Sequence, residues 1–452
     1  CTRIRLKNTD LEVGATEVNE PGPAALTWSM VRGSQPPSEV AQALPVSDKA
    51  SSKCRLKPCH CGVKGRYNTR VGFSLYIHIP YCQAKCPYCD FNSYAASTWP
   101  EDEYTRALIS ELRRRAHEPP FWGNSIATIF FGGGTPSLFR PDSIGCVLNE
   151  AAKAFGIDRD AEITLEANPG TVDFERLRGF RAAGINRMSF GAQSFNDSIL
   201  KFLGRIHNAA ETREAARMVH RAGFERLNLD LIFAVPGQTA GDVIRDISEA
   251  AALGPDHISA YNLTFEEGTA FFAEMRRGRI RPLESEEQAA MYAAVREEIP
   301  RRGYPMYEIS NYARPGRECR HNLTYWRAQT YLGLGAGAHS FAREGAGGRR
   351  WWNERNPARY IALASEEGIA EAGAEQVERR TAMGEFVFLN LRLREGFAPA
   401  DFAARFGSNF NDIFGARAAR LFEGGLMERA GDRIRLTDRG VELADSIFAE
   451  FV

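Results

Sequence analysis

Six short runs rich in β-branched and aromatic residues recur between residues 74 and 263, and a stretch with helical spacing follows each run. In the stretch at 101–116, Tyr104, Leu108 and Leu112 fall on one helix face. Apolar strands that alternate with helices predict parallel β/α units. Six units predict an α/β fold with an open, incomplete (β/α)6 barrel, whose ligands bind at the carboxyl ends of the strands. The runs lie at 74–79, 127–132, 162–167, 187–192, 227–235 and 257–263.

Polar or glycine residues mark the predicted carboxyl ends of five of these runs. A cysteine-rich loop at 82–89 follows the first run, and GGGTP at 132–136 follows the second. Glu166 ends the third run, Gln193 ends the fourth, and Asp230 lies within the fifth. Because the carboxyl ends of parallel strands meet at one rim, these features predict a single binding site there.

The cysteine-rich loop carries Cys82, Cys86 and Cys89 in the spacing C-x3-C-x2-C. Three thiolates can hold three corners of a cubane iron–sulfur cluster and leave the fourth iron open, whereas ferredoxin-type sites close the cluster with four cysteines. An open iron can bind and activate a small molecule. The alternative is a zinc site with His78 as the fourth ligand. GGGTP favours the cluster, because glycine lets the backbone come close to a ligand.

Charge and cysteine usage narrow the class of protein. Lys plus Arg equals Asp plus Glu, at 57 each, so no basic field draws the chain to nucleic acid or to a membrane surface. No apolar run approaches the roughly 18 residues of a membrane span, and the first residues lack the core of a secretory signal. The nine cysteines are unevenly clustered, which argues against disulfides and favours the cytoplasm.

The two ends of the chain differ from the repeating part. Residues 1–70 show no sustained period and predict a disordered leader, and Cys1 in place of Met indicates a fragment or an overlong translation. We expect the barrel over 71–305, a linking segment over 306–380 and an α+β module over 381–452. The module resembles a winged helix with only scattered arginines on its candidate recognition helix, which favours a docking or lid role over DNA binding.

The motifs YIHIPYCQAKCPYCDF (76–91) and FFGGGTPS (130–137) resemble those of the radical S-adenosylmethionine (SAM) superfamily. Within it, the chain from about residue 73 onward is similar to the group formed by oxygen-independent coproporphyrinogen III dehydrogenase and the heme chaperone HemW. The resemblance implies a [4Fe–4S] cluster on the three cysteines, with SAM on the open iron. It also implies an electron donor if SAM is cleaved. The radical chemistry then belongs to the cofactor, and the protein positions and shields it.

Nine positions match SAM-contacting positions of the superfamily. The two carboxylates among them can accept hydrogen bonds from the amine and the ribose of SAM, and the arginine can pair with its carboxylate. The alternative is that the two carboxylates line the barrel and are satisfied by a neighbouring arginine. The positions are Tyr76, Tyr88, Gly133, Gly134, Thr135, Glu166, Gln193, Arg205 and Asp230.

Two features separate the two branches of this group. The dehydrogenase branch has a fourth cysteine two residues after the third, where this chain has Phe91. The motif HNLTYW resembles the heme-linked signature of the chaperone branch, in which the histidine can bind heme iron while aromatic rings pack on the porphyrin. The alternative is a structural corner with a hydrogen-bonded histidine. The candidate heme-binding residues are His321, Asn322, Tyr325 and Trp326.

Several histidines and cysteines in similar segments receive no firm role. His78 and His207 have none from the sequence alone, and His339 is a second candidate contact for heme or substrate. Cys319 could matter if heme attaches covalently, but a buried thiol is commoner. Cys146 falls in a helical pattern and is expected in the core.

The sequence therefore predicts a cytoplasmic protein that binds a [4Fe–4S] cluster, SAM and heme, and transfers heme to an acceptor protein. The alternative is a coproporphyrinogen III dehydrogenase, which removes two propionate carboxyls to form protoporphyrinogen IX. The missing fourth cysteine and HNLTYW count against it. A methylating radical SAM enzyme is a third reading, disfavoured because no second reactive cysteine pair stands out. Whether the chain is an enzyme stays open at this point.

Overall fold

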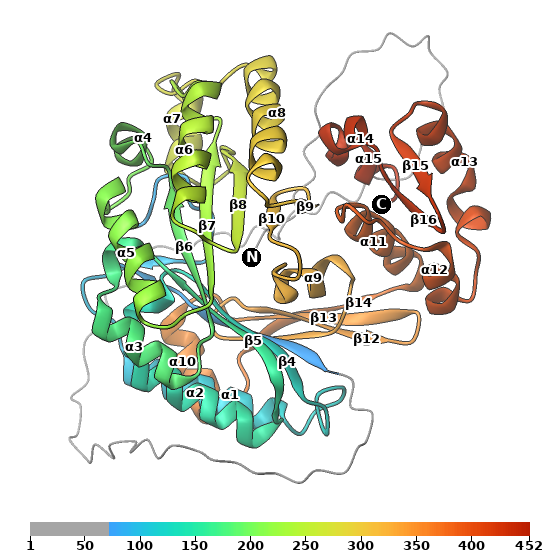
Figure 1. Ribbon diagram of the computed structural model, residues 1–452. Helices are drawn as coiled ribbons and strands as arrows, with labels where there is room; N and C mark the ends of the chain where they lie inside the picture. The colour runs from blue at the N-terminus through green and yellow to red at the C-terminus, as the bar shows by residue number, and fades with distance from the viewer. Residues whose placement is uncertain (1–71) are drawn as a thin grey trace, which may run out of the picture. The chain divides into compact units, whose positions relative to one another are not determined.

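The computed structural model describes residues 72–452, so the predicted leader at 1–70 lies outside the described residues. The described part is built on one sheet of 12 strands (Figure 1). Six parallel strands in chain order form its middle, which confirms the predicted α/β partial barrel. They are β1 (Phe73–Ile79), β4 (Ile126–Gly133), β5 (Ile157–Ala167), β6 (Arg187–Gln193), β7 (Arg226–Phe233) and β8 (His257–Asn262).

Helices connect the parallel strands and bury one face of the sheet. In α1 (Glu101–Arg115), the predicted apolar face of Tyr104, Leu108 and Leu112 is fully buried in the main core. Among residues 72–452, no helix has both the length and the apolar character that a membrane crossing requires. The other helices of this part are α2 (Pro141–Ala154), α3 (Phe174–Ala183), α4 (Asp197–Phe202), α5 (Ala209–Arg221), α6 (Ala240–Ala252), α7 (Ala270–Arg276) and α8 (Ser285–Arg301).

The two faces of the parallel sheet differ in chemistry, because successive side chains of a strand point to opposite faces. Alternate residues such as Leu75, Ile129 and Leu229 join the apolar core with the helices. The residues between them form a polar inner face on which hydroxyl, amide, imidazole and charged groups bond to one another. Its buried members include Ser74, Thr128, Glu162, Arg187, Asn228, His257 and Ser259.

Residues 306–377, expected as a linking segment, form strands that extend the sheet at both ends. Strand β11 pairs in parallel with β1, and β12, β13 and β14 continue from it in antiparallel order. At the other end, β10 and β9 pair antiparallel beyond β8. The elements are β9 (Met306–Glu308), β10 (Asn311–Ala313), α9 (Arg320–Trp326), β11 (Tyr331–Leu334), β12 (His339–Glu344), β13 (Gly347–Asn353), α10 (Pro357–Glu367) and β14 (Glu371–Val377).

The C-terminal part folds as a helical unit with a small antiparallel wing, as the sequence predicts. Phe386, Phe402, Phe410 and Phe414 form a connected set of buried aromatic contacts between its helices. Its elements are α11 (Arg379–Leu391), α12 (Pro399–Phe406), α13 (Phe410–Glu423), β15 (Met427–Ala430), β16 (Arg433–Leu436), α14 (Asp438–Glu442) and α15 (Ala444–Ala449).

Candidate functional site

The three cysteines lie on the loop that follows β1, at the carboxyl edge of the parallel strands, and each is partly buried. Every thiol has a polar neighbour at hydrogen-bonding distance for sulfur. Hydrogen bonds to cluster thiolates are one of the means by which a protein tunes the reduction potential of an iron–sulfur cluster. The pairs are Thr135 Oγ1 to Cys82 Sγ at 3.5 Å, Arg205 Nη1 to Cys86 Sγ at 3.4 Å, and Ser93 Oγ to Cys89 Sγ at 3.7 Å.

Contacts from both sides fix the course of this loop. The Lys85 ammonium donates to the carbonyls of Phe91 and Ser93, at 3.1 and 2.9 Å. The Pro87 carbonyl accepts a bond from the Phe271 amide at 2.9 Å. A Cβ added to Gly204, whose φ is +66°, would come within 2.6 Å of the Pro87 ring. The thiols are therefore held on a defined loop.

His78 does not complete a zinc site with these thiols. Its Nδ1 lies 2.9 Å from the Tyr76 hydroxyl and its Nε2 lies 2.8 Å from the Asn92 carbonyl, so both ring nitrogens are engaged. Burial lowers the pKa of His78 to about 4. Within residues 72–452, no three Cys, His, Asp or Glu side chains converge as ligands of a single metal ion. The donor set fits a polynuclear cluster on three thiolates better than zinc.

The GGGTP turn packs so closely on the loop that its middle positions require glycine. A Cβ on Gly133, whose φ is +116°, would lie 2.5 Å from the His78 ring. A Cβ on Gly134 would lie 2.6 Å from the Tyr81 carbonyl oxygen. The amide of Gly133 donates to Glu166 Oε2 at 3.2 Å. The backbone of the turn is thus tightly supported by the first strand and the cysteine loop.

Replacing Gly133 with alanine is expected to damage this turn specifically. The new Cβ would clash with His78, and a non-glycine residue at positive φ adds a strain of about 1–2 kcal/mol. We expect a lower melting temperature and at least tenfold weaker SAM binding, measured by equilibrium dialysis. Gly223→Ala is a matched control, since φ there is +83° but a Cβ meets nothing within 4 Å. Equal SAM affinity in the two variants would contradict a role for the Gly133 turn in binding.

The two carboxylates predicted to contact SAM lie on the inner face, and their hydrogen-bond partners are neutral. Glu166 accepts from the Gly133 amide, and Asp230 accepts from Asn228 Nδ2 at 2.8 Å. Burial raises the pKa of both carboxyls, and the charge of Asp230 raises the pKa of Glu166 further. The positive charge of Arg187 lowers the pKa of both carboxyls, so an arginine also neighbours them, as the barrel-lining alternative expects.

The remaining predicted SAM positions lie around the same edge. Gln193 has a φ of +66°, and its buried Oε1 has no hydrogen-bond partner among the described residues. Arg205 donates through Nη2 to the Gly191 carbonyl at 2.8 Å while Nη1 faces Cys86. The Tyr88 ring packs against Phe271, 6.3 Å between centroids. An unsatisfied buried acceptor beside a cationic group is what a polar ligand would complete.

Sequence reasoning did not single out three groups that support this edge. Asn92 and Ser93 follow the last cysteine and bond to His78 and Cys89. Asn228 bonds to Asp230 and to His257 Nδ1, at 2.8 and 2.6 Å. Asn228 could have been found from the sequence, because residues two apart on a strand share a face and Asn228 lies two positions before Asp230. His207 supports the edge as well, with Nε2 3.2 Å from the Ala192 carbonyl.

The HNLTYW motif forms helix α9, which packs against the inner face with its histidine fully buried. His321 Nδ1 lies 2.8 Å from Thr128 Oγ1, and Nε2 lies 2.9 Å from the Tyr325 hydroxyl. The imidazole stacks on Phe130, 5.1 Å between ring centroids. Burial lowers the pKa of His321 to about 3. In this arrangement neither ring nitrogen faces solvent, so iron could reach His321 only after one of these bonds has opened.

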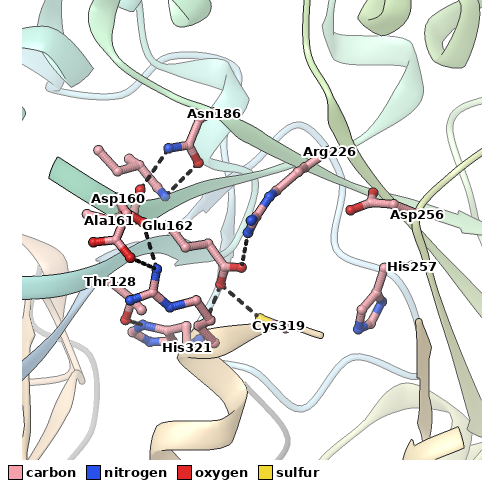
Figure 2. A network of polar contacts seen from close by, with 12 residues as sticks. Thr128, Asp160, Ala161, Glu162, Asn186, Arg226, Asp256, His257, Cys319 and His321 are labelled. Carbon is pink, nitrogen blue, oxygen red and sulfur yellow. Dashed lines mark hydrogen bonds and ion pairs between the residues drawn. The ribbon is translucent and has the colours of Figure 1, made fainter. Parts of the chain in front are cut away.

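Glu162 fixes the start of α9. Figure 2 shows its buried carboxylate between Arg226 and the beginning of the helix. Arg226 Nη1 lies 3.1 Å from Oε2, while the His321 amide and the Cys319 thiol donate to Oε1, at 3.2 and 3.5 Å. Burial raises the pKa of Cys319 to about 12. This thiol is thus buried and protonated, which favours a structural thiol over a covalent attachment point for heme.

The end of α9 is held by the C-terminal part of the chain. Trp326 is buried, and the Arg392 guanidinium lies 4.4 Å from its ring centroid. Arg392 also pairs with the fully buried Glu308, 3.1 Å from Nη2 to Oε2. Asn322 and Tyr325 are partly exposed. Of the four candidate heme-binding residues, two are therefore buried and two can be reached from solvent.

Comparisons with known proteins agree with this architecture. The family model described as Radical SAM superfamily matches residues 76–250, and that of the HemN C-terminal domain matches residues 377–443. The solved structure of coproporphyrinogen III oxidase (HemN) from Escherichia coli superposes with a TM-score of 0.73 at 24% identity. The match covers 84% of this chain and 90% of that one, and at this identity it establishes the fold alone.

Curated relatives are more similar in sequence. The chain is 35% identical over 383 residues to the heme chaperone HemW of Bacillus subtilis (strain 168), which covers 84% of this chain and 99% of that protein. It is 36% identical over 378 residues to the HemW of Mycobacterium tuberculosis (strain ATCC 25618 / H37Rv), with 83% and 93% covered. With the three-thiol loop and the GGGTP turn in place, the chain belongs to the heme chaperone HemW family of the radical SAM superfamily.

Proposed function

We propose that this protein carries one [4Fe–4S] cluster and SAM at the rim of its barrel, binds heme, and transfers the heme to an acceptor protein. The loop geometry carries the proposal: three supported thiols stand at 82, 86 and 89, and Phe91, 41% exposed, stands where the dehydrogenase branch has its fourth cysteine. The relatives named heme chaperones support heme as the cargo.

The residues at the rim divide the work of binding. Cys82, Cys86 and Cys89 would hold the cluster, which when bound supplies an open iron and an electron. Glu166 and Asp230 offer partly buried acceptors to amine and hydroxyl groups of SAM. The buried Gln193 Oε1 offers a further acceptor, and the Arg205 guanidinium places positive charge beside Cys86.

The heme contacts remain a prediction for His321, Asn322, Tyr325 and Trp326. The partly exposed pair, Asn322 and Tyr325, is accessible to a porphyrin edge. Use of His321 as an iron ligand requires Tyr325 to leave Nε2, because that nitrogen is bonded to its hydroxyl. The proposal also includes an unidentified heme-acceptor protein, an electron donor if SAM is cleaved, and the cytoplasm, where thiols stay reduced.

The experiment compares the two activities of the group on anaerobically reconstituted protein. One sample receives heme, and another receives coproporphyrinogen III, SAM and a reductant. We expect a stoichiometric heme absorption spectrum and no protoporphyrinogen. Formation of protoporphyrinogen that disappears in Cys82→Ser would instead assign the dehydrogenase activity, and absence of stoichiometric heme binding would reject the chaperone.

A further inference from the structure

A second histidine, His339, has an environment opposite to that of His321. His339 begins β12 and is exposed to solvent. It pairs directly with Trp352 of β13, and the two rings lie 5.9 Å apart at an interplanar angle of 30°. On β14, a Cβ at Gly373 would come within 2.6 Å of the Trp352 ring, so the glycine leaves room for the indole. An exposed imidazole thus stands beside a broad flat ring.

These two residues end a row of aromatic side chains that starts at the HNLTYW motif. Tyr325 of α9 contacts Tyr331 of β11 at 4.7 Å between centroids, and Tyr331 faces Phe341 of β12 at 6.4 Å. His339 lies two positions from Phe341 on the same strand face, about 7 Å along the strand. We name Tyr325, Tyr331, Phe341, His339 and Trp352 the aromatic row. Phe341 is buried, with the Arg350 guanidinium 5.9 Å from its ring centroid and bonded to Glu385 of α11, and exposure is greatest at His339.

The His339 end of the row adjoins the loop that carries the thiols. Asn92 of that loop donates to the Ala336 carbonyl at 2.9 Å, and a Cβ on Gly337 would come within 2.6 Å of its Nδ2. His339 follows Gly337 by two residues, so their Cα atoms are at most about 7.6 Å apart. The Arg355 carbonyl also accepts from Asn92, at 3.0 Å. A ligand on His339 would therefore lie beside the cysteine loop.

Charge at the edges of the row suits a planar ligand with carboxylates. Arg355 is exposed just after β13, at the His339 end of the row, whereas Arg343 is exposed four residues farther along β12. Arginine pairs well with carboxylates, and aromatic rings pack well against a porphyrin face. Histidine nitrogen is a usual axial ligand of heme iron. Of the two histidines on this face, His339 is the exposed one.

We propose that His339 is the first iron ligand for heme, with the porphyrin at the exposed end of the aromatic row, beside His339 and Trp352, and its propionates toward Arg355. This inference rests on the proposed heme binding and specifies its site. The HNLTYW helix then supports the heme site indirectly, through the contacts of Tyr325 with Tyr331 and of Tyr331 with Phe341, while buried His321 holds that helix in place. His321 is a positioning residue in this arrangement.

The test titrates heme into the full-length, anaerobically reconstituted chain and follows the absorption and resonance Raman spectra. We expect His339→Ala to weaken heme binding at least about tenfold and to lose the signature of histidine ligation, with cluster content and melting temperature unchanged. His339→Gly should regain that signature when free imidazole is added. His117→Ala, at an exposed histidine beyond the end of α1, is the matched control and should behave as the unaltered chain.

His321→Ala separates the two assignments. Because it removes a fully buried ring with two hydrogen bonds, we expect a lower melting temperature with retained histidine ligation in the folded fraction. Unchanged affinity and spectrum in His339→Ala would overturn the inference. Loss of histidine ligation in His321→Ala at an unchanged melting temperature would do the same. If the unaltered chain itself fails to bind heme, the proposed function falls, and this assignment with it.

Discussion

Cys82→Ser is expected to abolish the iron–sulfur cluster. A serine hydroxyl is not a thiolate, and two remaining thiols cannot hold three corners of a cubane. The contacts of Lys85 with the loop would remain. We therefore expect iron and acid-labile sulfide to fall to background after anaerobic reconstitution, together with the visible charge-transfer absorption.

Cys146→Ser is the control for this experiment, because Cys146 is also partly buried but lies on α2, away from the loop. It should retain full iron and sulfide content. Circular dichroism of both variants should match the unaltered chain, since neither cysteine belongs to the apolar core. Normal iron and sulfide in Cys82→Ser would reject the cluster assignment.

Arg392→Met is expected to have the largest effect on stability. It leaves the carboxylate of Glu308 buried without its cation, and breaking a buried pair from one side costs about 3–5 kcal/mol. It also removes the guanidinium that lies over Trp326. We expect a clear fall in the urea midpoint, and weaker heme binding because α9 loses its support.

Arg301→Ala is the matched control, since Arg301 pairs with Glu297 on the exposed side of α8. Exposed pairs contribute about 0–1 kcal/mol, so the urea midpoint should barely move. The double variant Glu308→Leu with Arg392→Met should recover part of the lost stability, because it leaves no unpaired buried charge. A midpoint shift in Arg392→Met no greater than that in Arg301→Ala would show that the Glu308 pair does not hold the two segments together.

The parallel half of the fold was predictable because its strands are short runs rich in β-branched and aromatic residues, separated by stretches with helical spacing. Each of the six runs became a strand near its predicted position, and α1 buried its predicted face. The strands of 306–377 escaped prediction for a physical reason. β9 and β10 have only three residues each, and β13 and β14 are rich in glycine and charge. Their stability comes from pairing with distant strands, which no local pattern reports.

The candidate site divides in a similar way. The cysteine spacing and the GGGTP turn are local, so the sequence was sufficient to bring them to one edge. The burial of His321 was not readable, because it depends on Thr128, which is 193 positions away. The exposure of His339 likewise follows from the pairing of β12 with β13. A motif indicates which residues matter, whereas only long-range packing decides which of their atoms a ligand can reach.

The contrasting burial of the two histidines also makes the rates at which a ligand can reach them different. His339 meets solvent continuously, so a molecule that uses it can arrive at a rate limited by diffusion and orientation. His321 becomes accessible only when α9 opens locally, a rarer event that requires breaking buried hydrogen bonds and stacking. The rate of heme binding at His339 would rise with the concentration of heme. The rate of heme binding at His321 would instead reach a maximum set by the rate at which α9 opens.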